Sequence, residues 1–252
     1  MARLIFYEDD HIYTVDGEEF PSVSEISRFA SREIYGDVSQ YALDNACSRG
    51  SSVHKATEIL DKYGKCECDE DIEPYLRAYV KFRKDFGISD YAYIEKAIAN
   101  EELKYAGTID RIYKIDENFA NAVTEHCKDF VYISEDGKVE KNRGKIELPE
   151  YSLGKFAIID LKSSSVVQNV LALIQLNGYK LSVEQNKLGE VTNLFILHLE
   201  KEGNYKLIMY QINPDLFKAC LTLHKALIKK KRVKKENAKN KENSNWLGND
   251  EW

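Results

Sequence analysis

One short apolar run constrains the fold of this chain more than any other feature. Residues Phe156–Leu161 read FAIIDL and are followed directly by Lys162. A run of this kind predicts a strand buried on both faces in the middle of a sheet. Side chains alternate along a strand, so Asp160 and Lys162 share one face, where an unpaired charge costs several kcal/mol. The two charges therefore need a structural or functional partner.

The segments around this strand predict an α/β protein with a central mixed β-sheet flanked by helices. A helix is expected after Ser163, over Val166–Gln185. The flanking runs rich in Ile, Val, Tyr and Thr are typical of strands. These strands are predicted at Tyr91–Ala99, Leu103–Ala106, Thr108–Ile115, Thr192–Leu199 and Tyr205–Ile212, and a last helix starts near Pro214.

The first hundred residues are predicted to form mostly helices that cover the sheet. A small hairpin is expected from Leu4–Tyr7 and Ile12–Val15 with a turn at Asp16-Gly17. The capping-box spacing from Ser22 to Glu25 predicts a short helix to about residue 30. Amphipathic patterns predict helices over 38–63, broken or tightened at Gly50, and over 72–86. The polar segment 117–155 predicts an inserted hairpin rather than a core element.

Length and charge predict one domain over residues 1–228 and a basic, flexible tail over 229–252. From Lys225 to Lys241 nine Lys or Arg accompany one acid, although the whole chain has a net charge of −6. The five cysteines show no disulfide or metal spacing, which favours a reducing, cytoplasmic compartment. Because no apolar run reaches 18 residues, no membrane partner is expected.

The acidic residues of two predicted strands suggest metal chemistry. Asp110 ends the sequence GTID, fifty residues before Asp160. Carboxylates suit Mg²⁺ or Mn²⁺, and such a cation activates water for phosphodiester hydrolysis. Asp110 and Asp160 are the expected ligands with the Leu161 carbonyl, while Lys162 orients the attacking water. Acid-x-Lys pairs also occur by chance in this chain, at Glu102-x-Lys104 and Asp136-x-Lys138, so the apolar context is the discriminating signal.

The order GTID, IDLK and Gln175-Leu176-Asn177-Gly178-Tyr179 resembles the PD-(D/E)XK nuclease superfamily, with its closest likeness to the RecB-like branch of phage- and mitochondrial-type exonucleases. The segment RGSSVHKATE around His54 resembles the metal-contacting histidine helix of that branch, and FPSVS at residues 20–24 is similar to its PSVT segment. The resemblance covers roughly residues 12–212 and implies a restriction-endonuclease-like core. It implies His54 as a metal ligand and Gln175 and Tyr179 as contacts to phosphate or to Lys162. The gap between Asp110 and Asp160 is longer than in compact members, and the cysteine cluster of iron–sulfur members has no counterpart, so no iron–sulfur cluster is expected.

Other polar residues each have more than one possible role. Glu58, four residues after His54, either orients it or solvates the helix. Glu95 either holds a second metal, pairs with a basic residue or is an ordinary exposed strand glutamate. Ser163 and Ser164 either bind phosphate or cap a helix. Arg111 points to the opposite face of its strand from Asp110, in a structural role or at the rim of a DNA site.

The leading hypothesis from these residues is a Mg²⁺-dependent deoxyribonuclease, an exonuclease acting on linear DNA ends or single strands. The alternatives are a structure-specific or restriction-type endonuclease on the same fold, and a DNA-binding protein that has lost cleavage. Recombination, repair and phage genome processing are all compatible roles. The basic tail is expected to contact DNA phosphates, and the stretch from Trp246 to Trp252 to dock on a protein partner.

Overall fold

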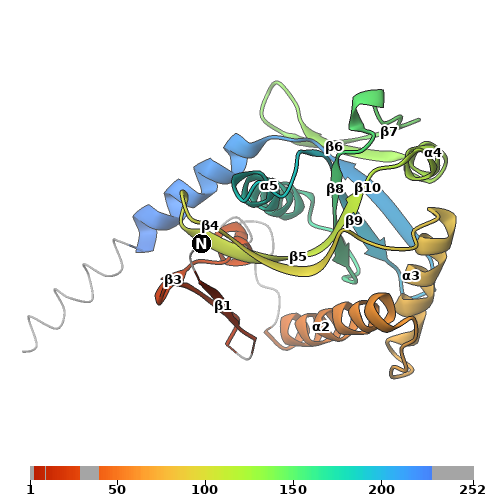
Figure 1. Cartoon of the computed structure of the whole chain (residues 1–252), viewed down its shortest axis with the longest axis horizontal. Coiled ribbons are helices and arrows are strands. Elements are labelled where there is room, and N and C mark those ends of the chain that lie inside the picture. The colour runs from red at the N-terminus through yellow and green to blue at the C-terminus, as the bar shows by residue number, and fades with distance from the viewer. Residues whose placement is uncertain (1–2, 9, 29–39, 229–252) are drawn as a thin grey trace, which may run out of the picture.

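The chain forms two β-sheets that differ in size. The computed structural model describes residues 3–8, 10–28 and 40–228, without the side chains of residues 40–47. A small antiparallel sheet holds β1 (Leu4–Tyr7), β2 (Ile12–Val15) and β3 (Glu18–Phe20). The central sheet has seven strands in the order β4-β5-β8-β9-β10-β6-β7 (Figure 1). Its strands are β4 (Tyr93–Asn100), β5 (Tyr105–Lys114), β6 (Asp129–Ile133), β7 (Val139–Arg143), β8 (Phe156–Lys162), β9 (Val191–Leu199) and β10 (Tyr205–Tyr210).

The central sheet is mixed, as the sequence predicts. Strands β8 and β9 run parallel and are joined by α5 (Asn169–Gln185), while β4, β5 and β8 are antiparallel neighbours. Every residue of β8 from Ala157 to Leu161 is buried. This burial confirms that the FAIIDL run forms an interior strand of an α/β protein with a helix-flanked mixed sheet.

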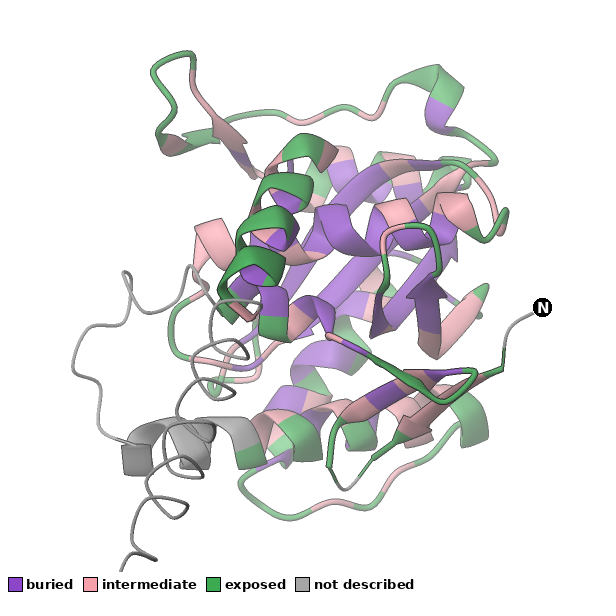
Figure 2. Ribbon diagram, turned by 90° about the vertical axis from the view of Figure 1, so that its left-hand side faces the viewer, coloured by how far each residue is buried: buried purple, intermediate pink, exposed green. Residues whose placement is uncertain are grey.

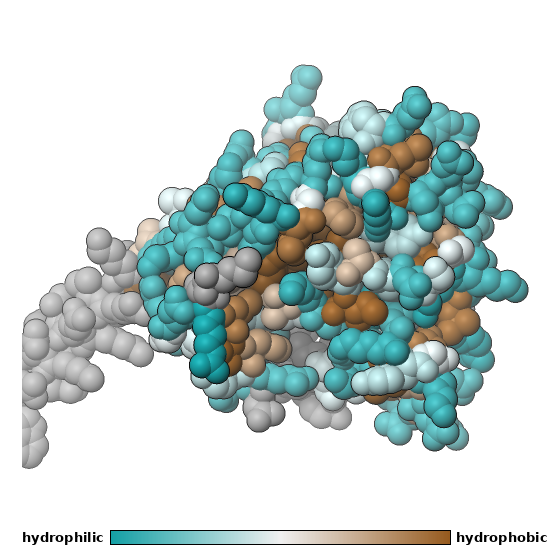
Figure 3. Space-filling view, viewed as in Figure 1, coloured by the Kyte–Doolittle hydropathy of each residue, from teal (hydrophilic) through white to brown (hydrophobic). Residues whose placement is uncertain are grey.

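Helices cover both faces of the central sheet. On one face α2 (Gln40–Tyr63), α3 (Glu73–Asp85) and α4 (Glu117–His126) pack on residues such as Ile159 and Leu161. On the other face α5 and a helix over residues 214–228 pack on residues such as Ile158. Figure 2 shows buried strands between helices whose outer sides are exposed. Figure 3 shows a largely hydrophilic outer face with hydrophobic side chains in separate patches.

The N-terminal region differs in part from the prediction. The hairpin of β1 and β2 is confirmed, but the turn at Asp16-Gly17 joins β2 to a third strand that was not predicted. Ser22 Oγ accepts a hydrogen bond from the backbone N–H of Glu25 at 3.0 Å, which confirms the predicted helix start; its predicted end lies outside the described residues. The expected break at Gly50 is wrong, because α2 continues through it.

The inserted segment contributes more than a hairpin. Strands β6 and β7 form the predicted hairpin around Asp136-Gly137. The expectation that it stays outside the core is wrong, because β6 pairs in parallel with β10 and extends the central sheet. The helix α4, which was not predicted, buries Phe119 beside Phe195 of β9. The segment is therefore part of the domain's packed core.

Two further predictions concern strand continuity and membranes. Residues 103–106 and 108–115 were expected as two strands, yet β5 is one strand that runs through Gly107. Among the described residues, no helix combines the length and apolar character needed to cross a membrane. The basic tail and the Trp246–Trp252 stretch lie outside the described residues.

Candidate metal centre

A helix and two strands bring three metal-ligating side chains together. His54 comes from α2, Glu95 from β4 and Asp110 from β5, and one ligand atom of each lies within 4.8 Å of the others. His54 Nδ1 lies 3.3 Å from Asp110 Oδ1 and 3.7 Å from Glu95 Oε1. Among the residues that the structure describes, this is the one group of three or more His, Cys, Asp or Glu with such a geometry.

The strand register explains why the acids meet. The pairs Ile94–Arg111 and Lys96–Ile109 flank Glu95 and Asp110, so these two residues stand opposite each other on β4 and β5. Glu95 has a left-handed backbone with φ of 46°, a conformation that costs a non-glycine residue about 1 kcal/mol or more. A residue held in such a conformation at an acidic cluster is typical of a functional position.

The neighbouring strand brings Asp160 close to Asp110. The β5–β8 pairing ends at Arg111–Ile159, one residue from each aspartate, and the charge of Asp110 acts on Asp160. The backbone N–H of Leu161 donates a hydrogen bond of 2.6 Å to Asp110 Oδ2. The two aspartates are thus held by adjacent strands of the sheet.

Asp160 and Lys162 lie on the same side of β8, as the alternation of side chains predicts. Lys162 Nζ is 2.6 Å from Asp160 Oδ2 as an ion pair, although this buried oxygen accepts no well-aligned hydrogen bond. Asp160 is 2% exposed. Burial raises the pKa of Asp160 to about 6, with the Asp110 carboxylate adding to the effect and Lys162 opposing it. The arrangement leaves a buried acid only partly satisfied by its protein neighbours.

Two neighbouring carboxylates raise the pKa of His54. Burial by itself lowers the pKa of His54, but the Asp110 and Glu95 carboxylates outweigh it and raise the pKa to about 10. Burial likewise favours the neutral form of Asp110, yet His54, Lys162 and the Leu161 N–H together lower its pKa. The imidazolium therefore neutralises the acids when no metal is bound.

The donor set fits a hard divalent cation. Carboxylate oxygens from Glu95 and Asp110 meet one imidazole nitrogen from His54, and the Asp160 carboxylate is near enough for its charge to interact with that of Asp110. Mg²⁺ and Mn²⁺ prefer carboxylate oxygen ligands. Asp110 and His54 meet as predicted, and Glu95 joins them. Asp160 lies outside the three-residue group, so its predicted role as a ligand stays a prediction. Leu161 contacts Asp110 through its N–H, so the role predicted for its carbonyl also stays a prediction.

Tyr179 of α5 closes one side of the acidic site. It is buried, and burial followed by the Asp160 and Asp110 carboxylates raises the pKa of its phenol. Its ring lies 2.9 Å from where a Cβ on Gly107 would stand, so a side chain at residue 107 would displace the ring. This contact explains the glycine three residues before Asp110. Gln175 lies one turn earlier on α5, half-buried, and its predicted phosphate contact stays a prediction.

The supporting residues are placed as follows. Glu58 pairs with Lys55 and Lys62 on the outside of α2, which supports the solvating role rather than a contact to His54. Ser164 Oγ donates to the carbonyl of Val166, a local turn contact. Ser163 is buried at the end of β8.

Several residues at the site were missed by sequence reasoning. Asp61 of α2, 1% exposed, forms ion pairs with Arg83 and Arg111. Its spacing of seven residues from His54 puts both on one helix face, a signal that was available in the sequence. Tyr13 of the small sheet bonds Thr108 Oγ1 at 2.9 Å, and the Glu95 and Asp110 charges add to the rise that burial causes in its phenol pKa. The small sheet thus forms part of the wall of the site.

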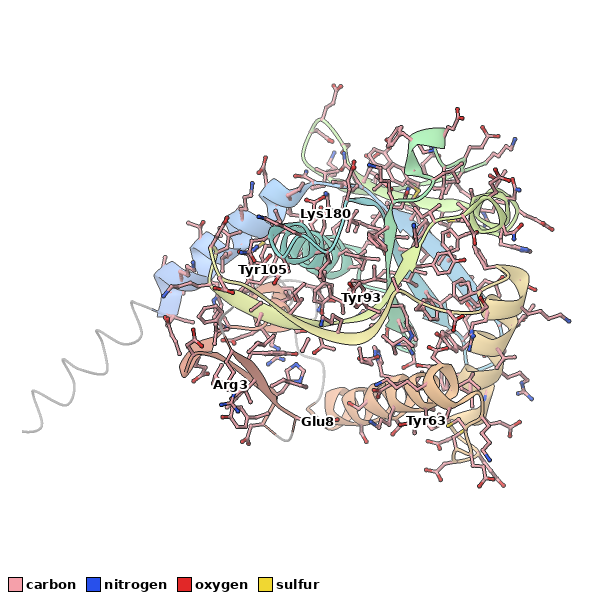
Figure 4. All side chains as sticks on the ribbon, in the orientation of Figure 1. Arg3, Glu8, Tyr63, Tyr93, Tyr105 and Lys180 are labelled. Atoms are coloured by element: carbon pink, nitrogen blue, oxygen red, sulfur yellow. The ribbon has the colours of Figure 1, made fainter. Side chains whose placement is uncertain are left out.

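The small sheet lies beside α2 near the candidate metal centre. Glu8, at the tip of the β1–β2 hairpin, lies toward the start of α2 in Figure 4, and its charge acts on Lys55 of that helix. His54 is 29% exposed, whereas Asp110 and Asp160 are buried.

No protein-family model matches the chain, and no curated protein matches it.

Proposed function

We propose that this chain is a Mg²⁺- or Mn²⁺-dependent deoxyribonuclease of the PD-(D/E)XK type. The observation that carries the proposal is the buried, electrostatically interacting pair Asp110 of β5 and Asp160 of β8, with Lys162 at Asp160 and His54 at Asp110. The strand order β4-β5-β8-β9 with α5 between β8 and β9 supports a restriction-endonuclease-like core. The resemblance of GTID, IDLK and QLNGY to the RecB-like branch agrees with this arrangement.

Each residue has a defined task in this proposal. His54, Asp110, Asp160 and Glu95 hold the cation, and the Leu161 carbonyl is a further candidate ligand. The bound cation stabilises charge on the phosphate and lowers the pKa of water. The Lys162 ammonium donates a hydrogen bond that orients the attacking water or a phosphate oxygen, since its Nζ lies beside Asp160. Tyr179 excludes water from the inner wall of the site.

The substrate proposed is DNA with linear ends or single strands. The preference for an exonuclease rests on the resemblance to the RecB-like branch, and the basic tail supplies nonspecific phosphate contacts. Cys66, Cys68, Cys127 and Cys220 are free thiols, which supports a reducing, cytoplasmic compartment. Recombination, repair and phage genome processing are the classes of pathway that would use such an activity.

Cleavage assays with Asp160→Asn test the proposal. The wild-type protein with Mg²⁺ is expected to degrade linear or single-stranded DNA, and Asp160→Asn is expected to abolish this while DNA binding is kept. Asp136→Asn is the matched control, because Asp136-x-Lys138 has the same acid-x-Lys pattern in an exposed turn with its own ion pair. Equal loss in both variants would contradict the assignment.

The substrate panel separates the alternatives. Cutting of closed circular DNA by the wild type would favour an endonuclease. Binding without cleavage of linear, circular or single-stranded DNA at any Mg²⁺ or Mn²⁺ concentration would favour a DNA-binding protein on the same fold.

A further inference from the structure

The buried Arg111 is the most heavily bonded side chain beside the candidate metal centre. It is a fully buried residue of β5, next to Asp110 in the chain, and it forms an ion pair with Asp61. Its Nε donates to Asp61 Oδ2 at 2.6 Å and to the Tyr79 hydroxyl at 3.1 Å. A guanidinium keeps its charge under all ordinary conditions, so a fully buried one needs several acceptors.

The remaining N–H groups of Arg111 donate hydrogen bonds to all three elements that supply His54, Glu95 and Asp110. Nη1 donates to Glu95 Oε1 at 2.9 Å and to the backbone carbonyl of Asp110 at 2.7 Å. Nη2 donates to Thr57 Oγ1 at 3.1 Å, and the Thr57 hydroxyl donates to the backbone carbonyl of His54 at 2.9 Å. One side chain therefore connects α2, β4 and β5 at the points where they present His54, Glu95 and Asp110.

These hydrogen bonds fix two things that strand pairing alone does not fix: the direction of the Glu95 carboxylate and the rotation of α2. The carboxylate of Glu95 is carried by a residue with a left-handed backbone, so regular pairing with β5 does not fix its direction. The helix α2 belongs to a segment far from the strands in sequence, and packing alone tolerates small rotations of a helix. The planar fork of Arg111 fixes both, because its donors point in set directions.

We propose that Arg111 is a positioning residue for the cation: it holds the Glu95 carboxylate and the His54 turn of α2 in the arrangement that binds the metal. Asp61 neutralises the guanidinium and anchors it to α2. This inference rests on the proposed metal-dependent function, and it adds a set of residues, Thr57, Asp61 and Arg111, that touch neither the cation nor the substrate.

Arg83 offers a matched control within the same network. Its Nη1 bonds the other oxygen of Asp61 at 2.9 Å, and its remaining bonds go to the carbonyls of Ile88 and Ser89 after α3. Arg83 and Arg111 thus share one buried carboxylate, yet only Arg111 extends to Glu95 and Thr57. A purely structural role of Arg111 would make the two arginines equivalent toward the metal.

The experiment compares Mn²⁺ binding to Arg111→Lys and Arg83→Lys. Free Mn²⁺ is measured by electron paramagnetic resonance in titrations of the metal-free full chain without DNA, and circular dichroism and thermal melting report folding. Lysine keeps the charge but has no fork, so Arg111→Lys is expected to weaken Mn²⁺ affinity about 10- to 100-fold, the range for lost support of metal ligands. Arg83→Lys is expected to lower the melting temperature while leaving the Kd for Mn²⁺ unchanged. Equal Kd values in the wild type and Arg111→Lys, or equal weakening in both variants, would overturn the proposal.

A second variant covers failure of Arg111→Lys to fold. Thr57→Val has the same shape and removes only the hydroxyl that links Arg111 to the His54 turn. It is expected to fold and to weaken Mn²⁺ binding, though less than Arg111→Lys does. Wild-type Mn²⁺ affinity in folded Thr57→Val would refute the α2 arm of the network and with it the proposal as stated.

A double-mutant cycle with Glu95→Gln tests the β4 arm. If Arg111 acts through Glu95, Arg111→Lys adds little to the loss that Glu95→Gln causes, because residues in contact are not additive. Full additivity of the two losses in Mn²⁺ affinity would contradict a role of Arg111 that acts through Glu95.

Failure of the proposed function can be told apart from failure of this inference. No Mn²⁺ binding by the wild type would reject the metal centre itself, whereas tight binding with unaffected variants would reject only the role of Arg111.

Discussion

The proton on His54 gives the sharpest quantitative prediction for the metal centre. With a pKa raised to about 10 by Asp110 and Glu95, the imidazole is protonated throughout the neutral range in the cation-free protein. Only the neutral imidazole ligates a metal, so a cation must displace that proton. Below pH 10 each unit of pH therefore changes the apparent affinity by about tenfold, or about 1.4 kcal/mol.

The sign follows from competition between proton and metal. Raising the pH from about 6.5 to 8.5 should tighten Mn²⁺ binding about 100-fold, because the free energy of removing the proton falls by about 2.7 kcal/mol. Asp160, whose pKa is about 6, adds a second proton only at the acid end and steepens the dependence there. The gain should continue toward pH 10 and then level off.

The assay is a set of Mn²⁺ titrations under nitrogen at several pH values, followed by electron paramagnetic resonance of free Mn²⁺. His54→Gln is the control, since it keeps a polar side chain but carries no titrating group, and it should bind Mn²⁺ more weakly with little dependence on pH above 7. Equal Kd values for the wild type at pH 6.5 and 8.5 would refute the reasoning. So would a pH dependence of the same size in His54→Gln.

Two more predictions follow from the geometry of the site, and a third follows from the basic sequence of the tail. Lys162→Met should slow DNA cleavage about 10²- to 10⁴-fold in single-turnover assays, while Mn²⁺ affinity stays equal or improves, because Lys162 no longer competes for Asp160; unchanged rates would remove the lysine from the mechanism. Gly107→Ala should lower the free energy of unfolding in urea by about 1–3 kcal/mol, since its Cβ would lie 2.9 Å from the Tyr179 ring; wild-type stability would show that the ring moves at no cost. Truncation from about Lys229 should weaken DNA binding and flatten its dependence on salt, and an unchanged slope would exclude the tail as a DNA contact.

The sequence predicted the central elements of the fold because their signals are local. The FAIIDL run and the alternation that puts Asp160 and Lys162 on one face follow from strand geometry and burial alone. The capping box at Ser22 and the turn at Asp136-Gly137 are likewise properties of a few adjacent residues. Such features need no knowledge of distant partners.

The errors concern choices that distant contacts decide. The pairing of β6 with β10 joins segments nearly eighty residues apart, so the polar pattern of the insertion did not reveal it. Gly50 did not break α2, since the cost of a helical glycine, about 1 kcal/mol, is small beside the packing of Val53 and Ala56. Gly107 did not end a strand because the neighbouring Tyr179 ring occupies the place of a side chain.

The candidate site shows the same difference between local signals and contacts with distant residues. Asp110, Asp160 and Lys162 were found from pattern, while Glu95 and Arg111 had no decisive local signal, and their roles depend on a left-handed residue and a buried five-contact guanidinium. The sequence predicts which charged residues lie on one strand. It does not predict which charged residue of another element will pair with them.

Charge balance links the proposed nuclease function to the proposed role of Arg111. Without a cation, the carboxylates of Glu95, Asp110 and Asp160 face the cationic His54, Lys162 and Arg111, so the buried cluster is close to neutral. A divalent cation that displaces the His54 proton adds a net charge of +1, which an approaching phosphate diester, with its single negative charge, would cancel. Asp61 and Arg83 carry opposite charges and pair with each other, and Asp61 also pairs with Arg111, so these two residues leave the balance unchanged. If the proposed cation binds, the cluster should therefore attract a phosphate only after the metal is in place, which is the order of events expected of the proposed nuclease.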